Sequence, residues 1–108
     1  MRRFPGCVAR VHVFVHGKVQ GVYYRDTTKK EADARGVRGW VRNLKDGRAE
    51  AVFEGEPAAV EAITAWCQIG SPMSRPTLVD RHDRGAEESL VGFDIRPTGA
   101  VSQRFVYE

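Results

Sequence analysis

The chain has 108 residues, 42% of them hydrophobic and 29% charged, a composition that predicts one soluble globular domain. No apolar run approaches the ~20 residues of a membrane span, and no apolar segment follows the basic start MRRFPGC, so we expect a cytoplasmic protein without a secretory signal. The net charge of +3 suits an anionic ligand and equally suits a solvated surface, so charge alone does not indicate nucleic acid.

The first part of the chain predicts one strand followed by one helix. From Ala9 to His16, valines at every second position share one face, which is a strand pattern with β-branched support. Residues 24–35 are rich in helix formers and precede Gly36, which stands where a helix usually terminates. The apolar stripe of this helix is weak, so its composition and its terminator carry the prediction.

A hairpin and a second helix are expected next. Two alternating runs, residues 37–43 and 48–54, flank an Asp-Gly pair, and Asp-Gly between such runs is a strong β-hairpin signal. Pro57 stands at a usual first helical position and Gly70 at a usual end, with apolar side chains at helical spacing between them. We therefore predict a helix over this segment.

The rest of the chain predicts a loop and two strands. The segment SPMSRP, residues 71–76, should be a loop, and residues 78–84 and 90–96 should be strands separated by a polar stretch. The resulting order β-α-β-β-α-β, with one further short strand, is the split βαβ arrangement. We expect an α+β, ferredoxin-like sandwich in which two helices cover one face of a mostly antiparallel sheet.

No repeat, low-complexity segment or linker divides the chain. We assign residues 1–8 to an N-terminal extension, residues 9–97 to the domain and residues 98–108 to a C-terminal tail. Two cysteines, Cys7 and Cys67, form no CxxC pair, and in a reducing compartment free thiols are favoured over a disulfide. The histidines have no ligand-pair spacing, so we expect no metal site.

The segment GKVQGVYYR, residues 17–25, joins the first strand to the first helix and contains two glycines. It lacks both the GxGxxG dinucleotide fingerprint and the GK[ST] ending of a Walker loop. Free N–H groups and the positive end of the dipole gather at a helix start, so this loop could wrap backbone donors around a phosphate. The alternative is a plain strand-to-helix turn that needs its glycines only for geometry.

Arg25 falls in the first turn of the predicted helix. A cation there opposes the helix dipole at a cost of about 0.3–1 kcal/mol. A bound dianion would compensate, because the guanidinium fork matches two phosphate oxygens. The alternative is an ion pair with Asp26 or with a distant carboxylate.

Several further side chains are candidates for a site. Asn43 ends a predicted strand, where asparagine is most often a turn former, although its amide could also fix a water by donating and accepting at once. His16 adjoins the glycine loop and could act as a base, but a solvated histidine at a strand end is the commoner case. Phe14 and Trp40 face away from the apolar side of their strands, which leaves an RNA-binding face open, although no segment matches the RNP signature.

Two long motifs resemble one family. GKVQGVYYR is similar to the G-x-V-Q-G-V-x-[FY]-R signature of the acylphosphatases, and GWVRNLKDGRAEAVFEG, residues 39–55, is similar to their second signature, G-W-V-[RK]-N-x-x-D-G-x-V-E. Ala49 stands where the second motif more commonly has valine. GSPMSRPTLVD resembles a further loop of the same family, and the resemblance extends over residues 11–97.

The resemblance implies hydrolysis of small-molecule acyl phosphates to a carboxylate and inorganic phosphate, which is product and inhibitor. Because family members act without metal or cofactor, it also implies that none is needed here. We further expect a free-standing monomer with no membrane or nucleic-acid partner. It places the catalytic arginine at Arg25 and the water-orienting asparagine at Asn43. The backbone amides that cradle the phosphate would be those of Lys18, Val19, Gln20, Gly21, Val22 and Tyr23. The alternative is a non-catalytic ferredoxin-like module that binds phosphate or RNA.

Overall fold

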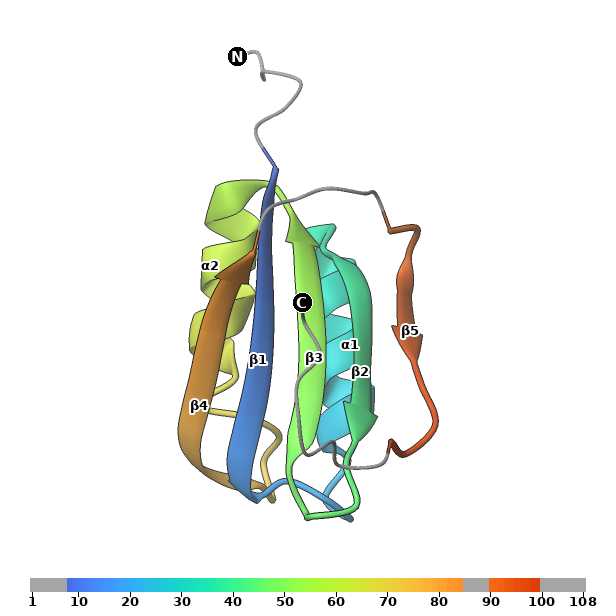
Figure 1. Cartoon of the computed structure of the whole chain (residues 1–108), viewed down its shortest axis with the longest axis vertical. Helices are drawn as coiled ribbons and strands as arrows, with labels where there is room; N and C mark the ends of the chain where they lie inside the picture. Colours follow the sequence, from blue (N-terminus) through green and yellow to red (C-terminus); the bar gives the residue numbers. More distant parts are fainter. Residues whose placement is uncertain (1–7, 85–89, 100–108) are drawn as a thin grey trace.

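The computed structural model describes residues 8–84 and 90–99, which form two layers (Figure 1). Two helices pack on one face of a five-stranded sheet whose strand order is β4-β1-β3-β2-β5. The elements are β1 (Ala9–Lys18), α1 (Tyr24–Arg35), β2 (Arg38–Asn43), β3 (Ala49–Gly55), α2 (Pro57–Trp66), β4 (Arg75–Arg84) and β5 (Phe93–Ile95). Most of the predicted extension and tail, and the polar stretch before the last strand, lie outside the described residues.

The pairing of the strands confirms the predicted fold class. β1 lies between β4 and β3 and is antiparallel to both, and β2 is antiparallel to β3. The short strand β5 is parallel to β2, so the sheet is mixed but dominated by antiparallel pairs. The two helices cover one face of this sheet, as expected for a ferredoxin-like α+β sandwich.

The core lies between the sheet and the helices. The valines that alternate along β1 are at most 2% exposed and pack there with Phe53 of β3 and Ile63 of α2, both fully buried. α1 contributes the stripe that its sequence only weakly indicated, since Tyr24, Thr28 and Ala32 are all buried. Thr28 and Ala32 are small, so this stripe adds little bulk to the core.

Tyr24 links the two helices at the end of the core. Its hydroxyl donates a hydrogen bond to the carbonyl oxygen of Cys67 over 2.9 Å, and its ring centroid lies 5.6 Å from that of Trp66. Burial raises the pKa of the Tyr24 hydroxyl far above its usual range, and burial raises the pKa of the Cys67 thiol to about 12. Cys67 is therefore a neutral, free thiol in the core, as predicted, whereas Cys7 lies outside the described residues.

The predicted end of the second helix was wrong by several residues. α2 ends at Trp66 rather than at Gly70. Beyond Trp66 the chain tightens, because the N–H groups of Ile69 and Gly70 both donate to the Trp66 carbonyl oxygen, over 2.8 and 2.9 Å. The residues before Gly70 form a turn, which the apolar spacing did not reveal.

The boundaries of the last strands also differ from the prediction. β4 begins at Arg75, so the predicted loop was too long at its end. Pro76 is tolerated within β4 because this strand lies at the edge of the sheet, where a missing N–H costs no ladder bond. β5 covers only Phe93–Ile95, because Gly92 before it turns the chain with φ 68°.

Gly39 in β2 is a position where only glycine fits. Its φ is 137°, and a Cβ there would collide with the carbonyl oxygen of Val52 on β3. We expect Gly39→Ala to destabilise the protein by about 2–5 kcal/mol, measured by urea unfolding. Gly36→Ala is the matched control, because Gly36 has φ 70° but open space where the alanine methyl group would lie. Backbone strain alone should therefore lower the stability of this variant by about 1–2 kcal/mol. Equal losses in the two variants would contradict this account.

Glu50 of β3 is a buried carboxylate on the face of the sheet opposite the helices. Its oxygens accept hydrogen bonds from Nε2 of His12 and Nε of Arg42, each over 2.7 Å. Burial alone would raise the pKa of Glu50, but the hydrogen bonds from His12 and Arg42 outweigh it and hold that pKa below the ordinary value of 4.5. The folded protein therefore favours the ionised form of this side chain.

This depressed pKa predicts how stability depends on pH. Since the folded pKa lies below the unfolded one, Glu50 stabilises the fold fully above the unfolded pKa and loses this contribution as pH falls through the folded pKa. We expect the melting temperature to fall on acidification below about pH 4.5. Glu50→Gln should flatten this part of the profile, whereas Gln at the exposed Glu56 should leave it unchanged. Parallel profiles for Glu50→Gln and the wild-type protein would refute the assignment.

Candidate active site

The segment between β1 and α1 is a tight loop anchored by two buried valines. Val19 and Val22 are 1% and 3% exposed and belong to the core, whereas Lys18, Gly21 and Tyr23 are exposed. Gly21 has φ 74° and Tyr23, the residue before α1, has φ 63°. A left-handed conformation costs a non-glycine residue roughly 1–2 kcal/mol, and strain of this kind concentrates at functional sites.

The backbone donors of this loop have no acceptor in the described part of the chain. Among the described residues, none of the N–H groups of residues 19–23 has a hydrogen-bond acceptor. The loop leads directly into the N-terminus of α1, where the positive end of the helix dipole lies. Unpaired N–H groups at a helix N-terminus form a site for an anion, which is the first of the two interpretations that the sequence allowed.

Arg25 is half-buried in the first turn of α1. In the part of the chain that the structure describes, no ion pair involves Arg25, so the alternative of a partner in Asp26 or a distant carboxylate is not found there. Its unfavourable position at the positive end of the helix is therefore not offset by an acidic side chain from residues 8–84 or 90–99. A guanidinium in this setting is available to an anionic ligand.

Asn43 is the last residue of β2 and is 9% exposed. Its backbone carbonyl oxygen accepts a hydrogen bond from the N–H of Gly99 over 2.9 Å. Its side chain makes no hydrogen bond to the described residues, and its Oδ1 atom is buried without a partner there. A turn-forming asparagine would use this oxygen to bind the backbone of its own turn. The backbone of Asn43 is thus fixed by Gly99, while its side chain has unused hydrogen-bonding capacity among the described residues.

Two side chains fix the loop against its surroundings. The Gln20 amide donates from Nε2 to the carbonyl oxygens of Leu44 and Arg48, which belong to the turn between β2 and β3. On the other side, the buried Ser71 hydroxyl donates to the carbonyl oxygen of Val22 over 2.7 Å. Sequence reasoning gave neither side chain a role. The family-like segment beginning at Gly70 was the available signal for Ser71.

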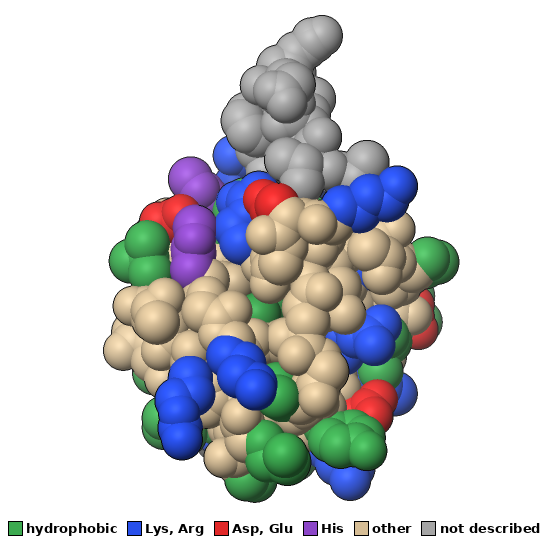
Figure 2. All heavy atoms as spheres, turned by 90° about the horizontal axis from the view of Figure 1, so that it is seen from below, with side chains coloured by type: hydrophobic (Ala, Val, Ile, Leu, Met, Phe, Trp, Pro, Cys, Tyr) green, Lys and Arg blue, Asp and Glu red, His purple; other side chains and the backbone are tan. Residues whose placement is uncertain are grey.

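The loop, the start of α1 and the turn between β2 and β3 all lie at the lower end of the molecule in Figure 1. Figure 2 views this end and shows Lys and Arg side chains around a surface of backbone and neutral side chains, with Asp and Glu side chains toward its margin. Lys18, Arg25 and Arg75 form no ion pair with the described residues, whereas Arg48 pairs with Asp46. The end of the sheet that carries the loop is suited to an anion.

His16 and the aromatic side chains have partners elsewhere. Nε2 of His16 lies 3.0 Å from Oδ2 of Asp80, on β4 rather than on the loop. Phe14 and Trp40 lie on the sheet face away from the helices, with a guanidinium over each ring: Arg48 is 4.9 Å from the centroid of Phe14, and Arg96 is 4.6 Å from that of Trp40. A guanidinium therefore lies over each of the two rings that the sequence left open for RNA.

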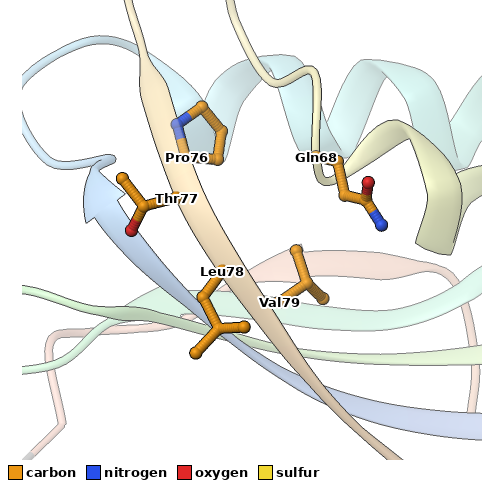
Figure 3. A pocket seen from close by; sticks show the side chains of 5 residues that line it. All are labelled: Gln68, Pro76, Thr77, Leu78 and Val79. Atoms are coloured by element: carbon orange, nitrogen blue, oxygen red, sulfur yellow. The ribbon is translucent and has the colours of Figure 1, made fainter.

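A separate pocket of about 310 Å³ lies beside the edge strand β4 (Figure 3). Gln68 lines it from the turn after α2, and β4 contributes Pro76, Thr77, Leu78 and Val79. No predicted site residue lines this pocket. It is therefore distinct from the loop that the sequence indicated.

The described residues offer neither a membrane-spanning helix nor a cluster of metal ligands. No helix of residues 8–84 and 90–99 is long and apolar enough to cross a membrane. Within the same residues, no group of three or more His, Cys, Asp or Glu side chains could hold a metal ion.

Comparison with known proteins identifies the family. Residues 11–95 match the model of the acylphosphatase family. An acylphosphatase of Haloquadratum walsbyi is 64% identical over 87 residues, which cover 81% of this chain and 92% of the relative, and one of a Synechococcus strain is 55% identical over 89 residues, covering 82% and 94%. The crystal structure of the acylphosphatase from Bacillus subtilis superimposes with a TM-score of 0.79 at 34% identity, covering 82% of this chain and 98% of that one.

The similarity spans both motifs, both helices and nearly all of the sheet, and favours an enzyme over the alternative of a binding module. The chain therefore belongs to the acylphosphatase family and hydrolyses the carboxyl-phosphate bond of acyl phosphates.

Proposed function

We propose that Arg25 and the loop amides of residues 18–23 bind the phosphoryl group of the substrate, and that Asn43 orients the attacking water. The observation that carries this proposal is the concentration of unused hydrogen-bonding groups at one end of the sheet. Within the described residues, the N–H groups of 19–23 lack acceptors, Arg25 lacks an acidic partner and Oδ1 of Asn43 is buried without a donor. A buried polar atom without a partner, such as Oδ1 of Asn43, is uncommon in folded proteins and requires a reason.

The chemistry needs little more than these groups. Water attacks phosphorus, the bond between phosphorus and the acyl oxygen breaks, and the carboxylate departs with the bonding electrons. Because a carboxylic acid has a pKa of roughly 4, the leaving carboxylate needs no proton from a general acid. The proton of the attacking water passes to a phosphoryl oxygen. Transfer through a loose transition state then depends mainly on positioning and on stabilising charge.

Asn43 and the loop divide these tasks. The loop amides and the Arg25 fork contact the equatorial oxygens, where charge accumulates in the transition state. The carboxamide of Asn43 accepts one hydrogen from the water through Oδ1 and so directs a lone pair at phosphorus. No side chain of the site serves as a nucleophile, and no metal or cofactor takes part.

The free enzyme is a cytoplasmic monomer, and inorganic phosphate is its product and its inhibitor. Phosphate fits the same loop because it presents the same oxygens as the transferred group. Nucleic acid is not a partner in this proposal, since no segment of the sequence matches the RNP signature.

The test is an assay of the purified full chain with benzoyl phosphate in metal-free buffer containing a chelator. Hydrolysis is monitored by the loss of the ultraviolet absorbance of benzoyl phosphate. We expect turnover that the chelator does not change and that inorganic phosphate inhibits competitively. Activity that requires added metal would refute the proposed mechanism. Inhibition by phosphate that is not competitive would refute the shared loop, and salt-sensitive retention of RNA would favour the binding-module alternative.

A further inference from the structure

The side chain of Gln20 connects the phosphate loop to the hairpin that follows Asn43. Its Nε2 atom donates to the carbonyl oxygen of Leu44 over 2.7 Å and to that of Arg48 over 3.0 Å. Leu44 follows Asn43 directly, and Arg48 precedes Ala49, the residue that pairs with Asn43 across the hairpin. One amide group therefore reaches both sides of the turn, just after β2 ends and just before β3 begins.

The hairpin leaves these two carbonyl oxygens able to accept a second bond. Leu44 donates its N–H to the carbonyl oxygen of Arg48 over 2.8 Å, and Gly47 donates its N–H to that of Leu44 over 3.1 Å. Each carbonyl oxygen has two lone pairs, so the Gln20 amide adds to these bonds without replacing them. The turn closes by itself, and Gln20 attaches the loop to it.

The loop and the hairpin have further, independent supports. Ser71 holds the loop through the carbonyl oxygen of Val22, and Gly99 holds the hairpin through its N–H to Asn43 and its carbonyl oxygen to Lys45. Among the side-chain hydrogen bonds of the described residues, those of Gln20 are the ones that join the two parts to each other. Without this amide, the loop and the hairpin would each keep their own supports but could shift relative to each other.

We propose that the Gln20 side chain is a positioning residue for hydrolysis, fixing Asn43 relative to the phosphate loop. The proposal rests on the function proposed above and adds a second role for Gln20, whose backbone belongs to the loop. Its amide sets the distance between the bound phosphoryl group and the water that Asn43 orients. A carboxylate at this position could not donate to two carbonyl oxygens, and asparagine would be shorter by one methylene group.

Gln20→Met tests the proposal, because methionine has a similar length and no donors. We expect kcat for benzoyl phosphate to fall about 10–100-fold, since a misplacement of about 1 Å can cost 10²-fold in rate. The inhibition constant of inorganic phosphate should change less than about 3-fold, because the loop amides and Arg25 remain. Gln20→Asn, whose amide side chain is shorter by one methylene group, should not reach the wild-type kcat either. Gln68→Met, at an exposed glutamine outside the site, should behave as the wild-type protein does in both measurements.

A double-mutant cycle with Asn43→Ala separates positioning from a general structural role. If Gln20 acts by placing Asn43, Gln20→Met should lower kcat less than about 3-fold once Asn43 is already replaced. An equal loss of kcat in both backgrounds, or a loss accompanied by an equal weakening of phosphate inhibition, would overturn the proposal. Circular dichroism at the assay temperature is the check that the variants are folded.

Comparing kcat in Gln20→Met and Asn43→Ala separates an error in the role of Gln20 from an error in the proposed role of Asn43. Wild-type kcat in Gln20→Met together with a strongly reduced kcat in Asn43→Ala would overturn the positioning role alone. Wild-type kcat in Asn43→Ala would contradict the proposed water-orienting role, and with it the positioning of that residue by Gln20.

Discussion

Arg25→Ala should lower kcat for benzoyl phosphate by about 10³-fold or more and should also weaken inhibition by inorganic phosphate. An arginine that stabilises the charge of a transferring phosphoryl group contributes roughly 10³–10⁵ to kcat. Arg25 has no acidic partner among the described residues, so its charge is not neutralised before the substrate binds. Steady-state kinetics with phosphate as a competing ligand measures both effects.

The stability of the same variant distinguishes a catalytic arginine from a structural one. Since a cation in the first turn opposes the helix dipole, Arg25→Ala should leave the melting temperature unchanged or raise it, equivalent to about 0.3–1 kcal/mol. Lys30→Ala, on the exposed side of α1, removes the same charge outside the site and should keep wild-type kinetics. Arg25→Lys keeps the charge but loses the fork, and we expect it to restore little activity. An inactive variant with a much lower melting temperature would contradict this interpretation.

The loop could be predicted from sequence because its residues are contiguous. Gly21 marks a left-handed turn, and the position of Arg25 in a helix start follows from the helix formers after it. The same local reasoning could not decide whether Arg25 pairs with Asp26, because that depends on where the side chain lies in space. Likewise, Asn43 could be placed at a strand end from the Asp-Gly turn. That its Oδ1 finds no partner among residues 8–84 and 90–99 became evident only in the folded chain.

The supports of the site depend on long-range contacts that periodicity does not encode. Gln20 bonds to carbonyl oxygens 24 and 28 residues away, and Ser71 to one 49 residues away. The start of β4 was missed for a related reason, since Pro76 indicates a loop locally but is accepted at a sheet edge. Local composition predicts helices, strands and turns. Tertiary packing determines the register of β1 against β4 and the hydrogen bonds that join the loop to the hairpin.

Asn43→Ala should lower kcat by about 10²–10³-fold while phosphate inhibition changes far less. Removing one group that acts on the reacting atoms typically costs about this much in rate. The loop amides and Arg25, which bind the phosphoryl oxygens in our proposal, are untouched by this substitution. Loss of a water-orienting group therefore appears in kcat, and loss of a binding group would appear in the inhibition constant as well.

The surroundings of Asn43 allow Asn43→Ala to test the role of its side chain in catalysis directly. Its side chain has no hydrogen bond within the described residues, so replacing it by alanine breaks no protein contact of that kind, and the backbone bond from Gly99 remains. Asn43→Asp keeps the shape but loses a donor and adds a negative charge beside the phosphate. It should lower kcat and weaken phosphate inhibition together, unlike Asn43→Ala. If Asn43→Ala chiefly weakened phosphate binding at an unchanged kcat, Asn43 would be a phosphate ligand, and the water would have to be placed by another group.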